Sequence, residues 1–265
     1  MENLYDRAYY CITRCDPVDK TQEVKALSEQ WRKGELSLEQ SGAPRLIDVP
    51  GKPDRLRLVH PRDLPRRSMH SKQGQLALIH AITHIEFNAI NLALDAVYRF
   101  RNLPDAYYSD WLRVACEEAQ HFCMLSEHLQ SMGYDYGDFD AHNGLWQMAI
   151  KTSEDVLIRM ALVPRVMEAR GLDVTPGIIA RFKSSGDEHA VSILNVILEE
   201  EVGHVEIGSR WFHYFCDQYG LPRQATFETL LQQYNAGGVK LPLHREARLQ
   251  AGFSEAELNY LEGLA

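Results

Sequence analysis

The chain has 265 residues, of which 45% are hydrophobic and 25% are charged, and its formal net charge at pH 7 is −9. This composition is that of an ordinary globular protein. The negative charge argues against whole-surface affinity for nucleic acid or for an anionic membrane. The longest apolar runs, such as residues 76–79, are short, whereas a membrane-spanning helix needs about 20 apolar residues. The first residues already include the acidic Glu2 and Asp6, a pattern unlike the positively charged and then apolar segments of a signal peptide. The expected location is cytoplasmic, with no membrane partner.

The cysteines predict no disulfide framework. There are five of them, an odd number, and none forms a Cys-x-x-Cys pair. Cys116 and Cys123 lie inside a helical pattern at a spacing that puts both on one face. Because free cysteine is among the most often buried residue types, we expect plain core thiols there rather than redox chemistry.

Residues 1–70 are predicted to form an N-terminal helix and an extended arm that packs on the rest of the chain. Residues 19–34 have the pattern of one amphipathic helix, with Gly34 as its stop. Residues 41–65 contain five prolines and little periodicity, which is typical of an extended segment.

From residue 71 onward the apolar pattern is strongly helical. One helix is predicted over about 71–101, and a second begins at Pro104 and runs to Gly133, a typical C-terminal stop. After a polar, turn-rich stretch at 134–144, a third helix is predicted to extend to Arg170 and to end at Gly171.

Two further segments complete the predicted bundle. Thr175-Pro176 is a good N-cap and first-position pair for a short connecting helix through about Phe182. Residues 184–187 break it, and a fourth long helix is predicted over about 187–219.

The remainder of the chain is also expected to be helical. After Pro222 one or two smaller helices are predicted, with Gly237-Gly238 and Pro242 between them. No strand signal of useful length is present, so the predicted fold is all-α. Its expected parts are residues 1–70, a four-helix bundle at 71–220 and a C-terminal helical extension at 221–265, together one compact unit.

Two Glu-x-x-His motifs stand on the predicted long helices, at Glu118–His121 and at Glu201–His204. A spacing of three puts both side chains on one helix face, with Cβ atoms about 5–6 Å apart, so both can reach one metal ion. Alone the motif is weak, because about one match is expected by chance among 21 Glu and 11 His.

A glutamate precedes each motif at a matched distance. Glu86 lies 32 residues before Glu118, and Glu168 lies 33 residues before Glu201. Each falls on the apolar face of its own predicted helix, where a carboxylate without a partner costs several kcal/mol. One Glu from each of two helices, with Glu-x-x-His from the other two, is the ligand set of carboxylate-bridged di-iron and di-manganese bundles. The predicted metal ligands are Glu86, Glu118, His121, Glu168, Glu201 and His204.

Further candidates flank this constellation. Glu117 and Glu200 each lie four residues before a motif histidine, and we hypothesise that they orient the imidazoles; solvated surface acids are the alternative. His80 and His84 have a spacing that can bind zinc, but a structural role is favoured. Five aromatic residues could support radical transfer or line a substrate channel, but we favour packing between helices for them. They are Tyr98, Tyr107, Tyr108, Trp111 and Trp211.

The segment 52–67 is basic, with six Lys or Arg residues against Asp54 and Asp63. Such an arm could bind an acidic partner or RNA. We favour pairing with carboxylates on the surface of the chain itself. The basic residues are Lys52, Arg55, Arg57, Arg62, Arg66 and Arg67.

Several stretches resemble a bacterial ferritin-like family, the domain of unknown function 455. They are 58–67, 84–86, 111–121, 163–176 and 200–208. The resemblance implies a ferritin-like fold and a metal site at the six residues above, and it supplies no substrate. More distantly the chain is similar to tRNA-hydroxylating di-iron monooxygenases, which share the ligand order but not the N-terminal arm. Ferritins proper have fewer histidine ligands, and the arm and tail depart from a storage-cage subunit.

The expected function is therefore that of a non-haem di-iron, or manganese/iron, oxidase or oxygenase that uses O₂. Glu118 and Glu201 are expected to bridge two metal ions, with Glu86 and Glu168 as terminal ligands and one histidine for each metal. The substrate is a small molecule or a tRNA-type substrate, and a homodimer is left open. An iron-binding or storage protein and a metal-stabilised binding module without turnover are the alternatives.

Overall fold

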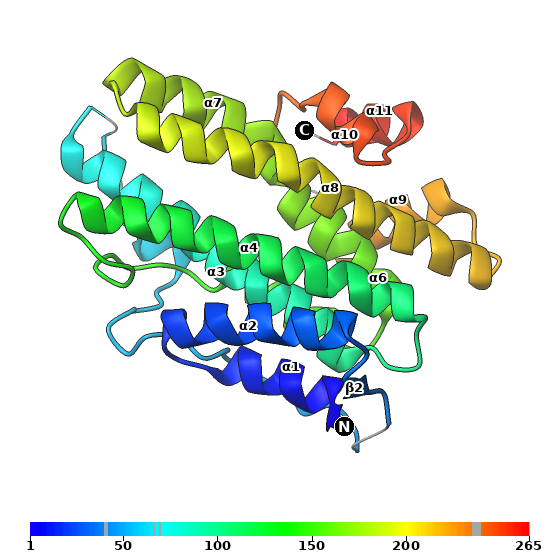
Figure 1. Ribbon diagram of the computed structural model, residues 1–265. Coiled ribbons are helices and arrows are strands. Elements are labelled where there is room, and N and C mark those ends of the chain that lie inside the picture. Colours follow the sequence, from blue (N-terminus) through cyan, green and yellow to red (C-terminus); the bar gives the residue numbers. More distant parts are fainter. Residues whose placement is uncertain (40–41, 66, 69, 235–239, 265) are drawn as a thin grey trace. The chain divides into compact units, whose positions relative to one another are not determined.

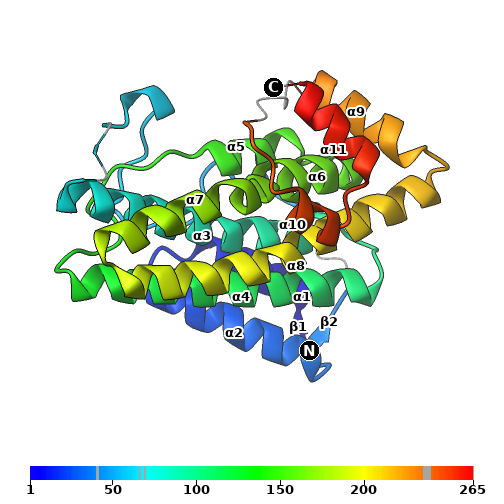
Figure 2. The same cartoon turned by 90° about the horizontal axis from the view of Figure 1, so that it is seen from above.

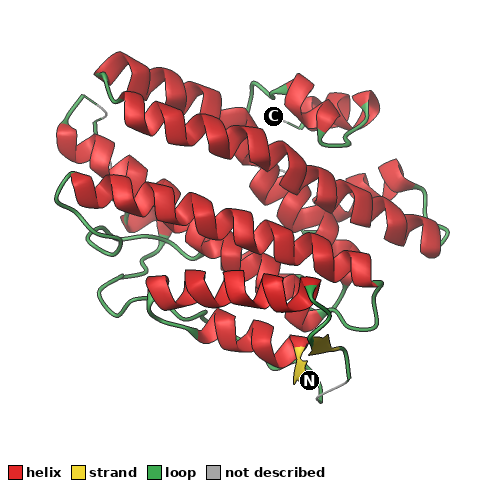
Figure 3. Cartoon of the chain, in the orientation of Figure 1, coloured by secondary structure: helices red, strands yellow, loops and turns green. Residues whose placement is uncertain are grey.

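The computed structural model describes residues 1–39, 42–65, 67–68, 70–234 and 240–264. Ser41 and Arg66 of the predicted arm, and the predicted Gly237-Gly238 break, lie outside the described residues. Helices dominate the described chain (Figure 3), which confirms the all-α prediction. The strands described are the two-residue β1 (Glu2–Asn3) and β2 (Leu36–Ser37), paired in parallel. By its contacts the chain divides into two compact units, Met1–Ile150 and Lys151–Ala265.

The first unit begins with two helices where one was predicted. α1 (Leu4–Thr13) begins at Asn3, whose side chain accepts hydrogen bonds from the backbone N–H groups of Tyr5 and Asp6. α2 (Pro17–Arg32) begins after the similar cap Asp16. The predicted start at residue 19 was therefore two residues late, and α1 was missed because its ten residues give few turns of helical periodicity.

Two long helices form the centre of this unit. α3 (Lys72–Arg99) and α4 (Asp105–Ser131) lie within two residues of the predicted helices. They form a hairpin, with α1 packed on α3 and α2 packed on α4 (Figures 1 and 2). Described residues of 42–65 are largely without regular structure, as predicted for an arm, apart from the short 3₁₀ turn η1 (Pro61–Asp63).

A buried polar contact fixes the N-terminal helices on α3. Lys20 of α2 is 0% exposed, and its Nζ donates to the backbone oxygen of Ile12 at 2.8 Å and to Asn91 Oδ1 at 2.5 Å. The Phe87 ring lies 4.9 Å from the same nitrogen. The Lys20 nitrogen therefore lies between two neutral oxygen acceptors and against an aromatic ring.

The helix predicted from 144 to Arg170 is wrong in its bounds. The structure has α5 (Gly144–Lys151), a break capped by Asp155, and α6 (Val156–Leu162). A π-helical segment, η2 (Val163–Glu168), follows directly. The Asp155 side chain accepts hydrogen bonds from the backbone of Leu157 and Ile158, which is why a new helix begins there.

The predicted stop at Gly171 and the separate connecting helix from Thr175-Pro176 to Phe182 are also wrong. α7 (Ala169–Ser185) runs through all of these residues. Gly171 keeps a helical backbone, and Pro176 removes only one backbone donor, while packing against α8 supports α7 (Figure 1). The end of α7 is at Gly186, whose φ is +80°, within the predicted break at 184–187.

The second unit continues with α8 (Glu188–Gln218), capped by Asp187, in agreement with the helix predicted over 187–219. Three further helices follow in the described residues, where one or two were predicted. They are α9 (Arg223–Gln233), α10 (Arg245–Gln250) and α11 (Glu255–Gly263). α11 begins with a capping box formed by Ser254 and Glu257.

The predicted division at residues 70 and 220 stays a prediction, and the contacts group the chain at residue 150 instead. Among the described residues, α3 has the length and apolar composition of a membrane span, and 78% of its most apolar window is buried. A buried core helix passes the same test, so this is weak evidence for a span.

Candidate metal centre

Three of the six predicted ligands come together in the first unit. Glu86 lies on α3, and Glu118 and His121 lie on α4. Because the α4 pair is three residues apart, both side chains leave the helix on one face. All three are buried, with exposed fractions of 4%, 1% and 0%.

The ligand atoms of this group converge. His121 Nδ1 lies 3.2 Å from Glu86 Oε2 and 3.3 Å from Glu118 Oε2, and the ligand atoms of the three residues lie within 4.8 Å of one another. Carboxylate and imidazole are ligand types that suit iron and manganese. Glu86, Glu118 and His121 are called the first half-site below.

The electrostatics of the first half-site favour a cation. Burial raises the pKa of the Glu86 carboxyl well above its ordinary value, and repulsion from Glu118 adds to this rise. Burial disfavours a charged His121, but its hydrogen bonds to Glu118 and Glu86 outweigh that effect and raise its pKa to about 11. Two buried carboxylates thus retain a proton between them and the imidazole. A divalent cation would replace that proton.

The other three predicted ligands lie in the second unit. Glu201 and His204 stand on α8, with His204 Nδ1 3.5 Å from Glu201 Oε1, as the three-residue spacing predicts. His204 is buried, whereas Glu201 is half-buried. Glu168 is the last residue of η2 and is half-buried. Glu168, Glu201 and His204 are called the second half-site.

The packing of η2 on α8 determines where Glu168 lies along α8. A Cβ added to Gly208 would lie 2.3 Å from Cβ and Cγ of Pro164, so only glycine allows this approach. Gly208 shares a face of α8 with His204 and Glu201, four and seven residues earlier. Glu168 is one turn after Pro164. If the chain runs back along α8 from this contact, Glu168 reaches the level of the motif.

The π-helical form of η2 was missed by sequence reasoning. Pro164 in the middle of an otherwise helical pattern is the available signal, since proline cannot donate the backbone hydrogen bond of a regular α-helix. Such π segments are rare and occur frequently at functional sites.

The hypothesised supporting residues Glu117 and Glu200 are half-buried on α4 and α8. Neither carboxylate lies fully in solvent. Their predicted role in orienting His121 and His204 stays a prediction.

The structural role favoured for His80 and His84 is confirmed. His80 Nε2 accepts the backbone N–H of Gly137 at 2.8 Å. His84 Nδ1 lies 2.8 Å from the Tyr136 hydroxyl, and its Nε2 lies 3.1 Å from the backbone oxygen of His142. Burial lowers the pKa of both histidines to about 4, so both imidazoles are neutral at pH 7.

The aromatic candidates take part in ring packing, as favoured. Tyr107 packs on Tyr108 and on Trp111, with ring centroids 5.6 and 6.3 Å apart. Tyr98 contacts Tyr9, and Trp211 contacts Tyr214. All five cysteines are free. Cys116 and Cys123 are half-buried thiols on α4, so the fully buried face expected for them is only partly formed.

The basic arm pairs in part with acidic residues of the same unit, as favoured. Arg57 binds Asp140 through two hydrogen bonds of 2.9 and 2.6 Å. Arg55 lies 3.3 Å from Asp135 and 3.7 Å from Asp138. These acids belong to the turn-rich segment after α4, which the arm therefore holds in place.

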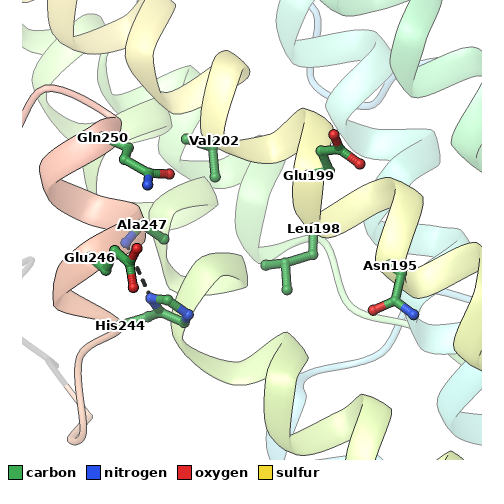
Figure 4. Close-up of a pocket in the computed structure, with 8 residues that line it drawn as sticks. All are labelled: Asn195, Leu198, Glu199, Val202, His244, Glu246, Ala247 and Gln250. Atoms are coloured by element: carbon green, nitrogen blue, oxygen red, sulfur yellow. Dashed lines mark hydrogen bonds between the residues drawn. The ribbon is translucent and has the colours of Figure 1, made fainter.

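A groove in the second unit encloses about 310 Å³ between α8 and α10 (Figure 4). Asn195, in its lining, lies nine residues before His204, so the two side chains leave α8 about 180° apart. The groove therefore opens on the other side of α8 from His204. Its lining residues are Asn195, Leu198, Glu199, Val202, His244, Glu246, Ala247 and Gln250.

Comparison with known proteins places all six predicted ligands inside one family match. The family described as "Protein of unknown function (DUF455)" matches residues 13–259. An "Uncharacterized protein" of Haemophilus influenzae (strain ATCC 51907 / DSM 11121 / KW20 / Rd) is 48% identical over 216 residues, which cover 79% of this chain and 75% of that protein. No solved structure gives a significant match.

Proposed function

The chain belongs to the family described as protein of unknown function (DUF455), and we propose that it is a non-haem di-iron, or manganese/iron, carboxylate protein that activates O₂. In this proposal the two half-sites form one two-metal centre in a ferritin-like bundle. The four helical segments would be α3, α4, the run from α6 through η2 into α7, and α8. This arrangement of ligands is the one described for di-iron carboxylate bundles.

The observation that carries the proposal is the first half-site. Glu86, Glu118 and His121 are buried donors whose ligand atoms lie within 4.8 Å of one another. Burying two carboxylates beside one imidazole is costly unless a cation compensates them. The second half-site supports the proposal, because Glu201 and His204 repeat the same spacing and contact.

The proposed roles follow from the ligand types. Glu118 and Glu201 would be the bridging carboxylates, Glu86 and Glu168 the terminal ones, and His121 and His204 would serve one metal each. Four carboxylates would balance the charge of two divalent cations. When bound, iron or a manganese/iron pair supplies the electrons that reduce O₂.

The protein side chains also control protons at this centre. His121 must give up its proton before Nδ1 can bind a metal, and the Glu86 carboxyl must be ionised. Metal binding therefore releases protons, and its affinity falls as the pH is lowered. The substrate belongs to the proposal only as a class, a small molecule or a tRNA-type substrate, and a homodimer is a further part of it.

The proposal predicts two metal ions per chain and O₂ consumption. Purified protein is loaded with Fe(II) without oxygen, freed of excess metal and analysed for iron by mass spectrometry. It is then exposed to O₂ in an oxygen electrode, and its native mass is measured. We expect two irons per chain and O₂ uptake linked to iron oxidation.

Each alternative has its own result. Many more ions per chain in a large assembly would indicate iron storage. Two bound ions without O₂ uptake would indicate a metal-stabilised binding module. Less than about half an ion per chain would refute the metal centre altogether. A Glu127→Gln protein should bind as much iron and consume as much O₂ as the wild type, because Glu127 is an exposed acid on α4.

A further inference from the structure

The C-terminal helices hold the segment that carries Glu168. Two arginines make this connection within the second unit. Arg165 of η2 pairs with Glu257 of α11 at 2.8 Å, and Arg248 of α10 pairs with Asp173 of α7 at 2.6 Å. Both pairs are nearly inaccessible to solvent, with side-chain exposed fractions of 0% and 3% in the first and 5% and 5% in the second.

Arg165 is fixed from several sides. Its Nη2 donates to Glu257, and its Nε donates to Ser209 Oγ of α8 at 3.1 Å. Three phenylalanine rings lie 4.2–4.7 Å from its guanidinium carbon. The arginine side chain thereby links η2 to α8 and α11 at a position three residues before Glu168. The three rings are those of Phe212, Phe227 and Phe253.

Arg248 contacts the chain immediately after Glu168. Its Nη2 donates to the backbone oxygen of Ala169 at 3.2 Å, and its Nε donates to Asp173 at 2.9 Å. Asp173 also accepts the backbone N–H of His244 at 2.9 Å. The backbone on both sides of Glu168 is thus connected to the C-terminal helices.

Stability alone does not explain why these two ion pairs are buried. A buried ion pair often contributes no more than hydrophobic residues of similar volume, because both charges lose their hydration. Burial indeed lowers the pKa of Arg165, although the Glu257 carboxylate opposes this effect. What an ion pair with directed hydrogen bonds adds is a defined geometry. A π-helical segment needs that support, because π-helices are rare and mostly limited to single turns.

We infer that α10 and α11 form a clamp on η2 and the start of α7, in which Arg165 and Arg248 are positioning residues that aim Glu168 as a metal ligand. The inference rests on the proposed function for the role of Glu168. The clamp is defined as the pairs Arg165–Glu257 and Arg248–Asp173. It gives the C-terminal extension a role in metal binding without any ligand of its own.

The test separates positioning from stability. In R165M/E257Q both buried charges are removed together, which avoids leaving one of them unpaired, and a glutamine at position 257 can keep the capping box of α11 with Ser254. The matched control is Glu262→Gln, which removes a half-buried α10–α11 ion pair away from η2, Arg245–Glu262 at 2.7 Å. For full-length wild type and both variants, we would measure the metal-free melting temperature, hydrogen exchange of residues 163–172, Mn(II) titration, and the EPR signal of a coupled Mn(II) pair.

In R165M/E257Q we expect a melting temperature close to that of the wild type, about tenfold faster exchange at 163–172, and about tenfold weaker binding of the second Mn(II) only. The EPR signal of the coupled pair should give way to that of isolated Mn(II). Glu262→Gln should match the wild type. The clamp would be overturned if R165M/E257Q exchanged hydrogen at 163–172 and bound both Mn(II) ions as the wild type does. It would also be overturned if the affinity for both ions fell equally and exchange became faster throughout the unit.

Failure of the proposed function would look different. Wild-type protein that binds neither Mn(II) nor Fe(II) would refute the metal centre. In that case the exchange rates at 163–172 would still show whether the Arg165–Glu257 pair holds η2.

Discussion

Glu118→Gln is expected to abolish two-metal binding and, at the same time, to stabilise the metal-free protein. Glutamine keeps the shape of Glu118 but cannot neutralise a cation, so metal affinity should fall at least about 100-fold. Without metal, two carboxylates compete for one nitrogen, because His121 Nδ1 lies 3.2 Å from Glu86 and 3.3 Å from Glu118. Removing one charge leaves a neutral Glu86–His121 pair.

The expected gain in the free energy of unfolding of the metal-free variant is about 1–3 kcal/mol, or about 2–6 °C in melting temperature for a chain of this size. Thermal unfolding with and without Fe(II), together with metal analysis, measures both effects. The exposed Glu127→Gln control should change stability by less than about 0.5 kcal/mol and retain both ions. A less stable Glu118→Gln protein that still binds two ions would show that Glu118 is a structural acid.

Lys20 is expected to make the free energy of unfolding rise with pH just above neutrality. Burial lowers the pKa of Lys20 from 10.5 to about 7. Between these two values the unfolded chain binds the proton and the folded chain does not. Stability increases with pH wherever the unfolded state binds more protons. From pH 7 to pH 9 the contribution of Lys20 should therefore become more favourable by about 2 kcal/mol.

The measurement compares urea unfolding of wild type and Lys20→Met in their metal-free forms at pH 7, 8 and 9. The comparison matters because His121, with its raised pKa, titrates in the same window with the opposite sign. Both proteins contain His121, so its effect cancels in the difference. Lys25→Met on the exposed side of α2 should show no such pH dependence. A constant difference between wild type and Lys20→Met would mean that Lys20 is protonated throughout.

Much of the secondary structure follows from local signals. The bounds of α3, α4 and α8 were predictable to within two residues, because Ser71, Pro104 and Asp187 are local start signals. The errors lie where tertiary packing outweighs local preference. Gly171 and Pro176 read as breaks, yet α7 passes through both where it packs on α8. α1 was missed because its ten residues give few turns of helical periodicity.

In the candidate site, too, some relations follow from local spacing and others depend on tertiary packing. Spacing alone predicts that Glu118 and His121 share a face, and that Glu201 and His204 do too, because these relations lie within one helix. The convergence of Glu86 with Glu118 and His121 depended on how α3 packs on α4. In the sequence, this convergence was indicated only by the similar distance from each upstream glutamate to its Glu-x-x-His motif.

By itself, the sequence determined the helical class, the main helix ends and the candidate metal ligands, since caps, periodicity and three-residue spacings act over one or two turns. Only the tertiary structure decided that Lys20 is buried against α3, that η2 is a π segment, and that Arg165 and Arg248 tie η2 and the start of α7 to the C-terminal helices. Those contacts join residues 71 to 92 positions apart. Neither the partners nor the loss of hydration that shifts the pKa of Lys20 can be read from neighbours in the chain.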